Sequence, residues 1–350
     1  MRARRPRIAD VARLARVSPA VVSMVVNGRT DSTIRIGPET RDRVWRAVRE
    51  TGYVANPIAQ QLARGKNHLL GVFTHEPVFP VDQHSFYHPF FVGIEREVEA
   101  RGYDLLLFTS AHGEDGVRSI FRDGVNRLLV AAGSVLLGWA DDRNEIRRLA
   151  SSNYPFTYVG RREIDDVVIP FAAADYASAT EEIVDHLVAL GHRRILYLSS
   201  LPRREASIDR RTGFIRAVTK HALDLPGTVE ARQDPGNIAP LQIKAWHDDG
   251  WTAVVIEDDL LAERFLSVAR CLDLVVPTDL SLAVLGDPLV VHQPSVPWTT
   301  FRIPRFEMGR HAAGLLVDLL ENPGSASPLQ AYLPCSFEPG STTGPVPGRG

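Results

Sequence analysis

The 350-residue sequence predicts an all-α N-terminal segment followed by an α/β core of two doubly wound parallel-sheet subdomains. Apolar residues recur at helical spacing from Ile8 to Thr51. From Leu69 onward, short apolar runs alternate with longer amphipathic segments, the pattern of parallel strands covered by helices on both faces. This alternating part spans roughly 270 residues, which exceeds one comfortable sheet and predicts two subdomains with a cleft between them.

Residues Ile8 to Gly28 indicate two short helices joined by a tight turn. The first is expected from Ile8 to Arg16, because its apolar residues repeat at three- and four-residue steps. Ser18 should cap the second, since a serine hydroxyl accepts a bond from an unpaired backbone N–H and Pro19 is tolerated at the first helical position. The residues expected to face inward are Ile8, Val11, Ala12, Leu14, Ala15, Val22, Val25 and Val26. Those expected on or near the outer face are Ala20, Ser23, Met24 and Asn27.

A third helix is expected from about Pro38 to Thr51, with Val44, Trp45 and Val48 closing a small core. Two helices, a tight turn and a buttressing third helix make the helix-turn-helix plan, whose second helix lies in the major groove of DNA. A helical cap on a larger domain would show the same spacing, so the pattern alone leaves both interpretations open.

The charge distribution favours the DNA-binding interpretation. Through His68 there are fourteen Lys and Arg against five Asp and Glu, a balance of +9, whereas the remaining 26 and 37 give −11. The basic excess coincides with the helix-turn-helix pattern and with a basic arm at Arg2, Arg4, Arg5 and Arg7. Such residues supply sequence-independent affinity for phosphates.

Residues 54–67 are expected to form a hinge between the headpiece, residues 1–53, and the core, residues 68–342. Asn56 can cap a helix, Pro57 can start it and Gly65 can end it. About two helical turns are marginal alone in water, so this helix should form only with a partner or on DNA.

Within the core we place subdomain 1 at about 68–170 and 301–330, and subdomain 2 at about 171–300 and 331–342. The chain should cross first near Ile169 to Ala174 and return near Thr299 to Pro304. Residues 343–350 are expected to be a disordered tail by composition. The predicted strands are Leu69–Phe73, Tyr103–Phe108, Leu128–Ala131, Val135–Leu137, Phe156–Val159, Ile195–Leu198, Ala253–Ile256 and Leu280–Leu285. The predicted helices are Pro89–Arg101, Tyr176–Leu190, Asp209–His221, Asp259–Leu272 and Arg305–Glu321.

Several function classes are disfavoured. The sequence has neither an apolar run long enough to span a membrane nor an apolar signal segment, so we expect a cytoplasmic protein. Cys271 and Cys335 lie far apart, and His75, His84 and His88 lack convincing metal spacing, so no metal or cofactor is expected. The motifs of serine hydrolases, P-loop enzymes and zinc proteases are absent, and the adjacent carboxylates Asp258 and Asp259 would diverge at a helix start. An enzyme is therefore not expected.

The sequence resembles the lactose-repressor/galactose-repressor (LacI/GalR) family of bacterial transcription regulators from about Ile8 to Thr342. The family pattern in the first helices is matched at Asp10, Val11, Ala12, Val17, Ser18, Val22, Ser23, Val25 and Asn27, and in the hinge at Tyr53, Asn56, Ala59 and Leu62. Further resemblance lies in GYDLLLF (102–108), HLVALGHRRILYLS (186–199), RRTGF (210–214), DDLLA (258–262), VPTDLSL (276–282) and PWTTFRIPRFEMG (297–309).

The resemblance implies a homodimer with helix-turn-helix headpieces, hinge helices and a core related to periplasmic sugar-binding proteins. It implies binding to a nearly palindromic double-stranded operator, and control by a small effector, most simply a carbohydrate, in the cleft. A solute-binding protein without a DNA role is the alternative, but it would carry a secretion signal and no basic headpiece. The DNA-binding residues implied are Ser18, Pro19, Ala20, Ser23, Met24, Asn27, Tyr53, Asn56, Ala59 and Leu62, with Leu62 inserted into the minor groove.

Met24 departs from the family, since many relatives carry an arginine there that contacts guanine. Without that arginine, readout at this base step would rest on apolar contact and DNA shape, so we expect an unusual half-site. Ala55 replaces the hinge proline and Gln60 replaces a frequent arginine, which is expected to loosen the hinge when DNA is absent.

In the cleft, the resemblance selects Phe90 and Phe91 as aromatic residues that stack on the effector, although two phenylalanines at a helix start also suit a plain core. Arg210 matches an arginine that binds effector hydroxyls or carboxylate. Arg161, at a strand end, and Asp258 are further effector candidates. Gly286 occupies the position of a family aspartate, so either Asp287 takes over or that contact is lost, which argues against a simple pyranose.

Overall fold

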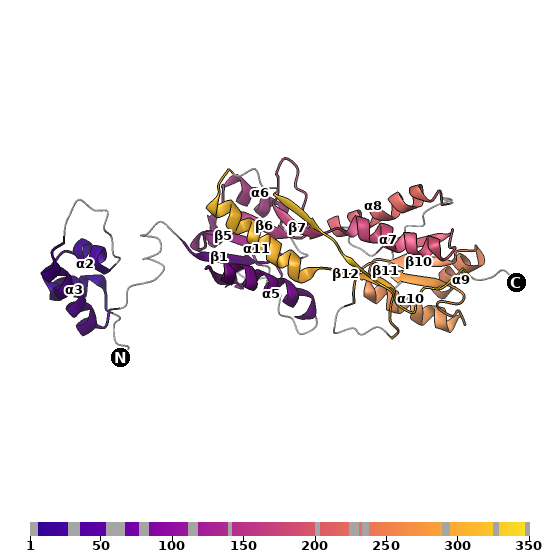
Figure 1. Ribbon diagram of the computed structural model, residues 1–350, viewed down its shortest axis with the longest axis horizontal. Coiled ribbons are helices and arrows are strands. Elements are labelled where there is room, and N and C mark those ends of the chain that lie inside the picture. The colour runs from indigo at the N-terminus through magenta and orange to yellow at the C-terminus, as the bar shows by residue number, and fades with distance from the viewer. Residues whose placement is uncertain are drawn as a thin grey trace. The chain divides into compact units, whose positions relative to one another are not determined.

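The computed structural model describes residues 6–26, 36–53, 67–76, 84–110, 118–138, 142–199, 204–223, 231–232, 238–288, 295–324 and 329–346. The chain divides into two compact units, residues 1–68 and residues 69–350 (Figure 1). The first unit is helical in its described part, and the second contains both parallel sheets. No helix in the described ranges is long and apolar enough to cross a membrane.

The described part of the first unit contains three helices where the sequence predicts them: α1 (Ile8–Ala15), α2 (Pro19–Val26) and α3 (Pro38–Thr51). The cap of α2 is confirmed, because Ser18 Oγ accepts a hydrogen bond from the Val21 N–H at 3.3 Å. Pro38 begins α3, and Gly52 ends it with a φ of 65°. The hinge helix expected at residues 54–67 lies almost wholly outside the described residues.

The core of this unit is built from small residues. Two of the expected core residues are wrong, because Leu14 is 46% exposed and Trp45 is 41% exposed. On α1 the inward positions go to Val11, Ala12 and Ala15, which leaves Leu14 at the edge of the apolar face. On α3, Val44 and Ala47 take the inward positions. Trp45, which directly follows Val44, therefore turns outward. The fully buried core residues are Val11, Ala12, Ala15, Val22, Val25, Val44 and Ala47.

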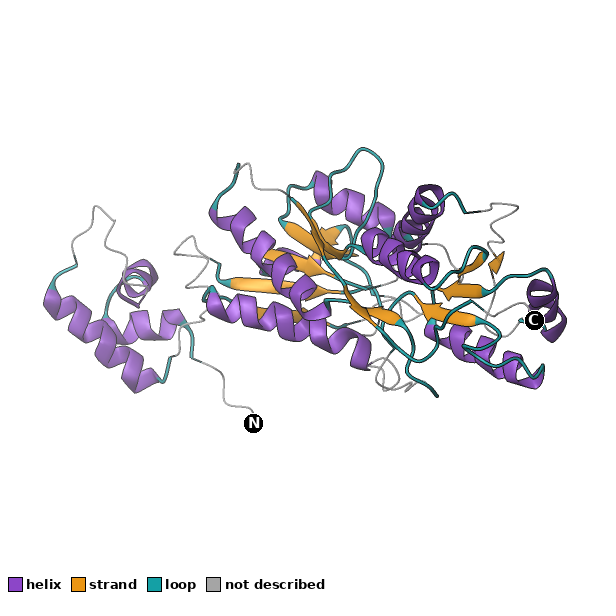
Figure 2. Cartoon of the chain, turned by 45° about the vertical axis from the view of Figure 1, so that its right-hand side comes forward, coloured by secondary structure: helices purple, strands orange, loops and turns teal. Residues whose placement is uncertain are grey.

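Subdomain 1 of the second unit is a six-stranded parallel sheet in the order β13-β7-β6-β5-β1-β2, covered on both faces (Figure 2). Helices α5 (His84–Ala100) and α11 (Arg305–Glu321) pack closely together on one face. A Cβ on Gly309 would lie 2.1 Å from Phe90 O, so glycine permits this close approach. Helix α6 (Arg143–Ser151) covers the other face through Ile146 and Leu149. The strands are β1 (Leu69–Phe73), β2 (Asp104–Phe108), β5 (Gly133–Leu136), β6 (Phe156–Val159), β7 (Phe171–Ala174) and β13 (Gln330–Leu333).

Subdomain 2 is a four-stranded parallel sheet in the order β11-β10-β8-β9. Its strands are β8 (Ile195–Ser199), β9 (Ala231–Arg232), β10 (Ala253–Ile256) and β11 (Ser281–Val284). One face packs against α7 (Tyr176–Ala189) and α8 (Glu205–Lys220), and the other against α9 (Pro240–Asp248) and α10 (Asp259–Cys271). A Cβ on Gly213 would lie 2.0 Å from Ala177 O, which explains the glycine of the RRTGF segment.

Three crossings join the two subdomains: β7 to α7, β12 (Thr300–Arg302) to α11, and β13 to β14 (Ser336–Glu338). Strands β12 and β14 pair antiparallel. The return near Thr299 to Pro304 agrees with the structure, because β12 leads into α11. The expected subdomain boundaries at 170/171 and 330/331 are wrong. They would place β7 and β13 in subdomain 2, whereas these strands pair with each other inside the six-stranded sheet of subdomain 1.

Three further expectations need correction. Leu128–Ala131 is not a strand but part of a 3-10 turn, η1 (Arg127–Val130), because Asn126 Oδ1 caps the Leu128 N–H at 2.9 Å. The turn follows a short hairpin of β3 (Phe121–Arg122) and β4 (Val125–Asn126). Helices α5 and α8 begin earlier than expected, at His84 and Glu205. Residues 343–346 are not a loose tail, because Gly344 and Val346 form backbone hydrogen bonds with subdomain 2.

Candidate DNA-reading helix and effector cleft

Helix α2 presents an uncharged surface. Ser18, Pro19 and Ala20 are exposed, whereas Ser23 and Met24 are half-buried. The sequence PAVVSMVV contains no acidic or basic residue. A helix of this composition offers hydroxyl and apolar contacts to DNA, so charge must come from other parts of the headpiece.

The cations of the headpiece lie on the elements that flank α2. The described basic residues are Arg7, Arg13, Arg16, Arg41, Arg43, Arg46 and Arg49, against the acidic residues Asp10, Glu39, Asp42 and Glu50. Such an excess attracts phosphates without reading sequence. Tyr53 is half-buried against the headpiece core. Asn27, Asn56, Ala59 and Leu62 lie outside the described residues.

A pocket of about 560 Å³, including its open mouth, lies between the two subdomains at the carboxyl ends of β5 and β6. This is the edge at which parallel α/β sheets bind ligands. Subdomain 1 supplies most of the wall, and the first turns of α7 and α8 supply the rest. The lining residues are Phe86, Tyr87, Phe90, Leu137, Gly138, Val159, Gly160, Arg161, Arg162, Ala173, Tyr176, Ala206, Asp209 and Met308.

One wall of the pocket is aromatic. Phe86 packs edge-on against Tyr87 and Phe90, with ring centres 5.0 Å and 5.6 Å apart. Arg305 places its guanidinium carbon 5.2 Å from the centre of the Phe86 ring. Phe91 does not line the pocket and packs against the core of subdomain 1 instead. Phe90 therefore lines the pocket. Phe91 lies in the core, which is where the alternative interpretation of the two phenylalanines, as plain core residues, places it.

Arg161 links the two subdomains at the pocket. Its Nε and Nη2 lie 3.0 Å and 2.9 Å from the two carboxylate oxygens of Asp209 on α8. Its Nη1 donates to Glu163, and its Nη2 also approaches Glu205 O at 3.4 Å. All three guanidinium nitrogens are thus engaged, so Arg161 would have to give up a protein partner to bind an effector directly.

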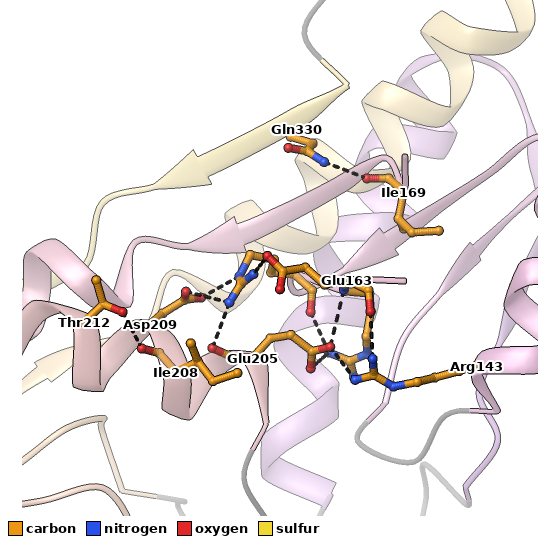
Figure 3. A network of polar contacts seen from close by, with 10 residues as sticks. Arg143, Glu163, Ile169, Glu205, Ile208, Asp209, Thr212 and Gln330 are labelled. Atoms are coloured by element: carbon orange, nitrogen blue, oxygen red, sulfur yellow. Dashed lines mark hydrogen bonds and ion pairs between the residues drawn. The ribbon is translucent and has the colours of Figure 1, made fainter. Parts of the chain in front are cut away.

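A second contact between the subdomains lies beside the first. Glu205, at the start of α8, is almost fully buried and accepts a hydrogen bond from Arg143 Nη2 at 2.8 Å. Figure 3 shows Glu205 reaching from α8 towards Arg143 and Glu163, with Asp209 one turn further along the helix. We name these four residues, Arg143, Arg161, Glu205 and Asp209, the inter-subdomain cluster.

The carboxylate of Asp209 is costly to bury. Burial raises the pKa of Asp209, and the hydrogen bonds and charge of Arg161 offset only part of that rise. An ion pair that is largely buried adds little net stability, but removing one partner leaves the other charge uncompensated. The contact exists only in an arrangement of the two subdomains that keeps Arg161 and Asp209 within hydrogen-bond distance.

Arg210 has a different environment from Arg161. Its Nε donates to Leu285 O at 2.7 Å, and its guanidinium carbon lies 4.0 Å from the centre of the Tyr176 ring. Among the residues that the structure describes, no carboxylate forms an ion pair with Arg210. Arg210 does not line the pocket, but Tyr176, which it contacts, does.

The two predicted aspartates already have structural partners. Asp258 caps α10 by accepting the Leu261 N–H at 3.0 Å, and burial raises its pKa. Asp287 forms an ion pair with Arg305 Nη1 at 2.5 Å and accepts the Ile303 N–H at 2.9 Å. Gly286 lies beside Arg210. Asp287 therefore fixes the start of α11, and neither aspartate lines the pocket.

Sequence reasoning missed Asp209, Glu205 and Tyr176. The helix was expected to begin at Asp209, and this residue was given no role in the cleft. The signal that could have found it is the acidic residue directly before the Arg210 motif, paired with an arginine at a strand end. Glu205 and Tyr176 carry no comparable motif.

Comparisons with known proteins agree with this architecture. Residues 7–56 match the model for bacterial regulatory proteins of the lacI family. Residues 76–233 match the model for periplasmic binding proteins and the sugar-binding domain of the LacI family, and residues 184–343 match a periplasmic binding protein-like domain.

Individual relatives extend over nearly the whole chain. The chain is 30% identical to the regulator MalR of Streptomyces coelicolor, covering 89% of each sequence. It is 26% identical to the regulator CelR of Thermobifida fusca, covering 91% of this chain and 92% of that protein. The crystal structure of the lac repressor dimer bound to operator and the anti-inducer ONPF matches with a TM-score of 0.66 and 22% identity, covering 97% of this chain and 100% of that one.

The headpiece, the pair of parallel-sheet subdomains and these matches lead to one conclusion. The chain belongs to the LacI family of bacterial regulatory proteins, and it is a DNA-binding transcriptional regulator rather than an enzyme.

Proposed function

We propose that this protein is a cytoplasmic repressor that binds a nearly palindromic operator as a homodimer and responds to a small effector in the cleft. The observation that carries the effector half is the pocket between the subdomains, with an aromatic wall and a polar rim at the carboxyl ends of parallel strands. A ligand that contacts both subdomains has different affinities for their different arrangements, and this is the requirement for control.

For DNA, α2 enters the major groove with Ser18 and Ser23 as polar contacts and Pro19, Ala20 and Met24 as apolar ones. Asn27 and Tyr53 complete the headpiece contacts. In the hinge, Asn56, Ala59 and Leu62 contact the minor groove, with Leu62 as the wedge. Because residue 24 is Met24 rather than an arginine, readout at this base step rests on apolar contact and DNA shape, so the half-site differs from that of relatives with an arginine at position 24.

For the effector, Phe90 supplies an apolar surface, and Arg210 offers terminal nitrogens that lack a carboxylate partner among the described residues. Arg161 holds the wall of the pocket against α8 through Asp209, whereas Asp258 and Asp287 are engaged by α10 and Arg305. The relative CelR has been crystallised with cellobiose. A carbohydrate or a related polyhydroxy metabolite suits an aromatic wall with charged groups at its rim.

The test is a selection from random double-stranded DNA with the full-length protein, followed by anisotropy titration of the recovered duplex. The titration is repeated with a panel of sugars, nucleosides and organic acids. We expect a two-fold symmetric sequence whose half-site is not the ordinary family one, and a shift in affinity with at least one polyhydroxy compound. Recovery of the ordinary half-site, or a response confined to organic acids, would contradict the corresponding half of the proposal.

A further inference from the structure

The turn between α1 and α2 contains an arginine in a backbone conformation that favours glycine. Arg16 follows the last residue of α1 and has φ 54° and ψ 49°. The Val17 N–H donates to Ala12 O at 3.0 Å, and the Arg16 N–H donates back to Arg13 O at 3.3 Å. This is a Schellman-type helix end, whose left-handed position is usually glycine because a Cβ is disfavoured there.

Nothing in the described part of the headpiece uses the charge of Arg16. Its side chain is exposed, and within the described ranges it has no hydrogen-bond or ion-pair partner. Arg13, nearly one turn earlier, pairs instead with Asp10 at 3.3 Å. Val17, on the other side, packs against the headpiece core. The chain therefore accepts an unfavourable backbone conformation at a residue whose side chain contributes nothing to the headpiece fold that is described.

The neighbouring helix lacks what Arg16 offers. Helix α2 has no charged residue, and its exposed N-terminal residues begin at Ser18, two positions after Arg16. A helix that enters a groove needs phosphate contacts to fix its register, and these come from cations or N–H groups near its start. Arg16 is the described cation closest in sequence to that start.

We propose that Arg16 binds a DNA backbone phosphate beside the N-terminus of α2 and supplies the positioning charge that the helix itself lacks. The planar guanidinium donates charge-assisted hydrogen bonds to phosphate oxygens and needs no particular base. This inference rests on the proposed docking of α2 in the major groove. The turn between α1 and α2 then contacts DNA through Arg16, in addition to the contacts of α2.

The test compares full-length variants in anisotropy titrations against two duplexes of equal length. One duplex is that recovered by selection with the wild-type protein, and the other has a scrambled sequence. Arg16→Gly and Arg16→Asn remove the charge, and both residues tolerate the left-handed conformation. Arg16→Lys keeps the charge. Arg122→Asn is the matched control, because Arg122 is an exposed cation of the second unit.

Arg16→Gly and Arg16→Asn should weaken binding to both duplexes by a similar factor. The slope of log K against log salt should become shallower by about 0.9 for each headpiece engaged. Arg16→Lys should keep most of the affinity and the wild-type slope, and Arg122→Asn should match the wild type. The melting temperature of Arg16→Gly should equal or exceed that of the wild type, because glycine removes the backbone strain.

Wild-type affinity and slope in Arg16→Gly would overturn the inference. A loss confined to the selected duplex would also overturn it, because that result indicates base readout rather than a phosphate contact. If the wild type itself binds neither duplex, the proposed docking fails and this inference fails with it, a result distinct from an unaffected variant.

Discussion

The two subdomains that flank the cleft are held by opposite kinds of polar group, one half-buried and charged, the other buried and held by neutral partners. In subdomain 1, Glu145 accepts the Ile120 N–H at 2.8 Å and lies 3.1 Å from His75 Nε2. Burial alone would raise its pKa, but hydrogen bonds from His75, Ser119 and two backbone N–H groups lower the pKa of Glu145 to about 2. Subdomain 1 is therefore fixed by a carboxylate that stays ionised.

In subdomain 2 the corresponding group is a histidine held by neutral partners. His192 is fully buried, with Nδ1 2.9 Å from Thr252 Oγ1 and Nε2 3.0 Å from both Ser281 Oγ and Gly344 O. Burial lowers its pKa. Because Gly344 belongs to the last residues of the chain, subdomain 2 is completed by a distant segment, whereas the Glu145 network of subdomain 1 lies within residues 75–145. The two halves of the cleft should therefore respond separately to perturbation.

The largest expected effect is loss of the C-terminal segment. A chain ending at Glu338 loses the partners of Leu282 N at 2.7 Å and Thr299 N at 2.9 Å, and one of the two partners of His192 Nε2. The two buried N–H groups left unpaired should lower the free energy of unfolding of subdomain 2 by about 4 kcal/mol. Urea denaturation measures the fall in the free energy of unfolding, and hydrogen exchange shows in which subdomain the backbone N–H groups lose protection.

The matched control is a chain ending at Val346, which keeps every one of these contacts and should match the full chain. Equal loss of protection in both subdomains after truncation at Glu338 would contradict their separate response.

The second effect concerns the link between the subdomains. Arg161→Ala leaves the half-buried Asp209 without its partner, so the free energy of unfolding should fall by about 2 kcal/mol, less than for a fully buried pair. In a double-mutant cycle, the variant that carries both Arg161→Ala and Asp209→Ala should lose less stability than the two single variants lose together, because neither charge is left without its partner. Simple additivity would show that this part of the inter-subdomain cluster is not coupled.

The third effect is a stepwise loss of stability in acid. The pKa of His192 is below its ordinary 6.5 in the folded protein, so the unfolded chain takes up the proton first and stability falls as pH drops below about 6.5. The pKa of Glu145 falls from 4.5 to about 2, so its contribution is present above pH 4.5 and is lost between about pH 4.5 and 2.

Unfolding measured across pH should therefore show the first loss in subdomain 2 and the second in subdomain 1. His192→Gln should remove the first step, and Glu145→Gln the second. A single step that both variants shift equally would contradict the comparison.

Much of the fold was predictable because it rests on periodic apolar patterns. The Ser18 cap, α3, β1, β6, β10 and α11 have the predicted positions, since each couples a clear apolar repeat or run to a start or stop signal. The strand Gln330–Leu333 was missed because QAYL is short and half exposed. Its pairing partner β7 is distant in sequence, so only the tertiary structure specifies it.

The cleft was less predictable. Phe90, which the family resemblance selected, and Arg161, which lies at a strand end, both line the pocket. The partners of Arg161 come partly from the other subdomain. Arg161 and Arg210 were both predicted to bind the effector, and the structure separates them because Asp209 pairs with Arg161 and not with Arg210. The prediction for residues 343–346 was wrong because glycine and proline also suit a segment whose backbone hydrogen-bonds along a subdomain.

The smallest expected effect in free energy, and the most direct test of the account, is the response of DNA binding to the effector in Arg210→Ala. The titration uses the selected duplex and the most effective compound of the panel, with the exposed Arg216→Ala on the same helix as control. Arg210→Ala should bind the duplex as tightly as the wild type without the compound, and should need about tenfold or more compound for the same response. An unchanged response in Arg210→Ala would contradict the assignment of the effector site to this cleft.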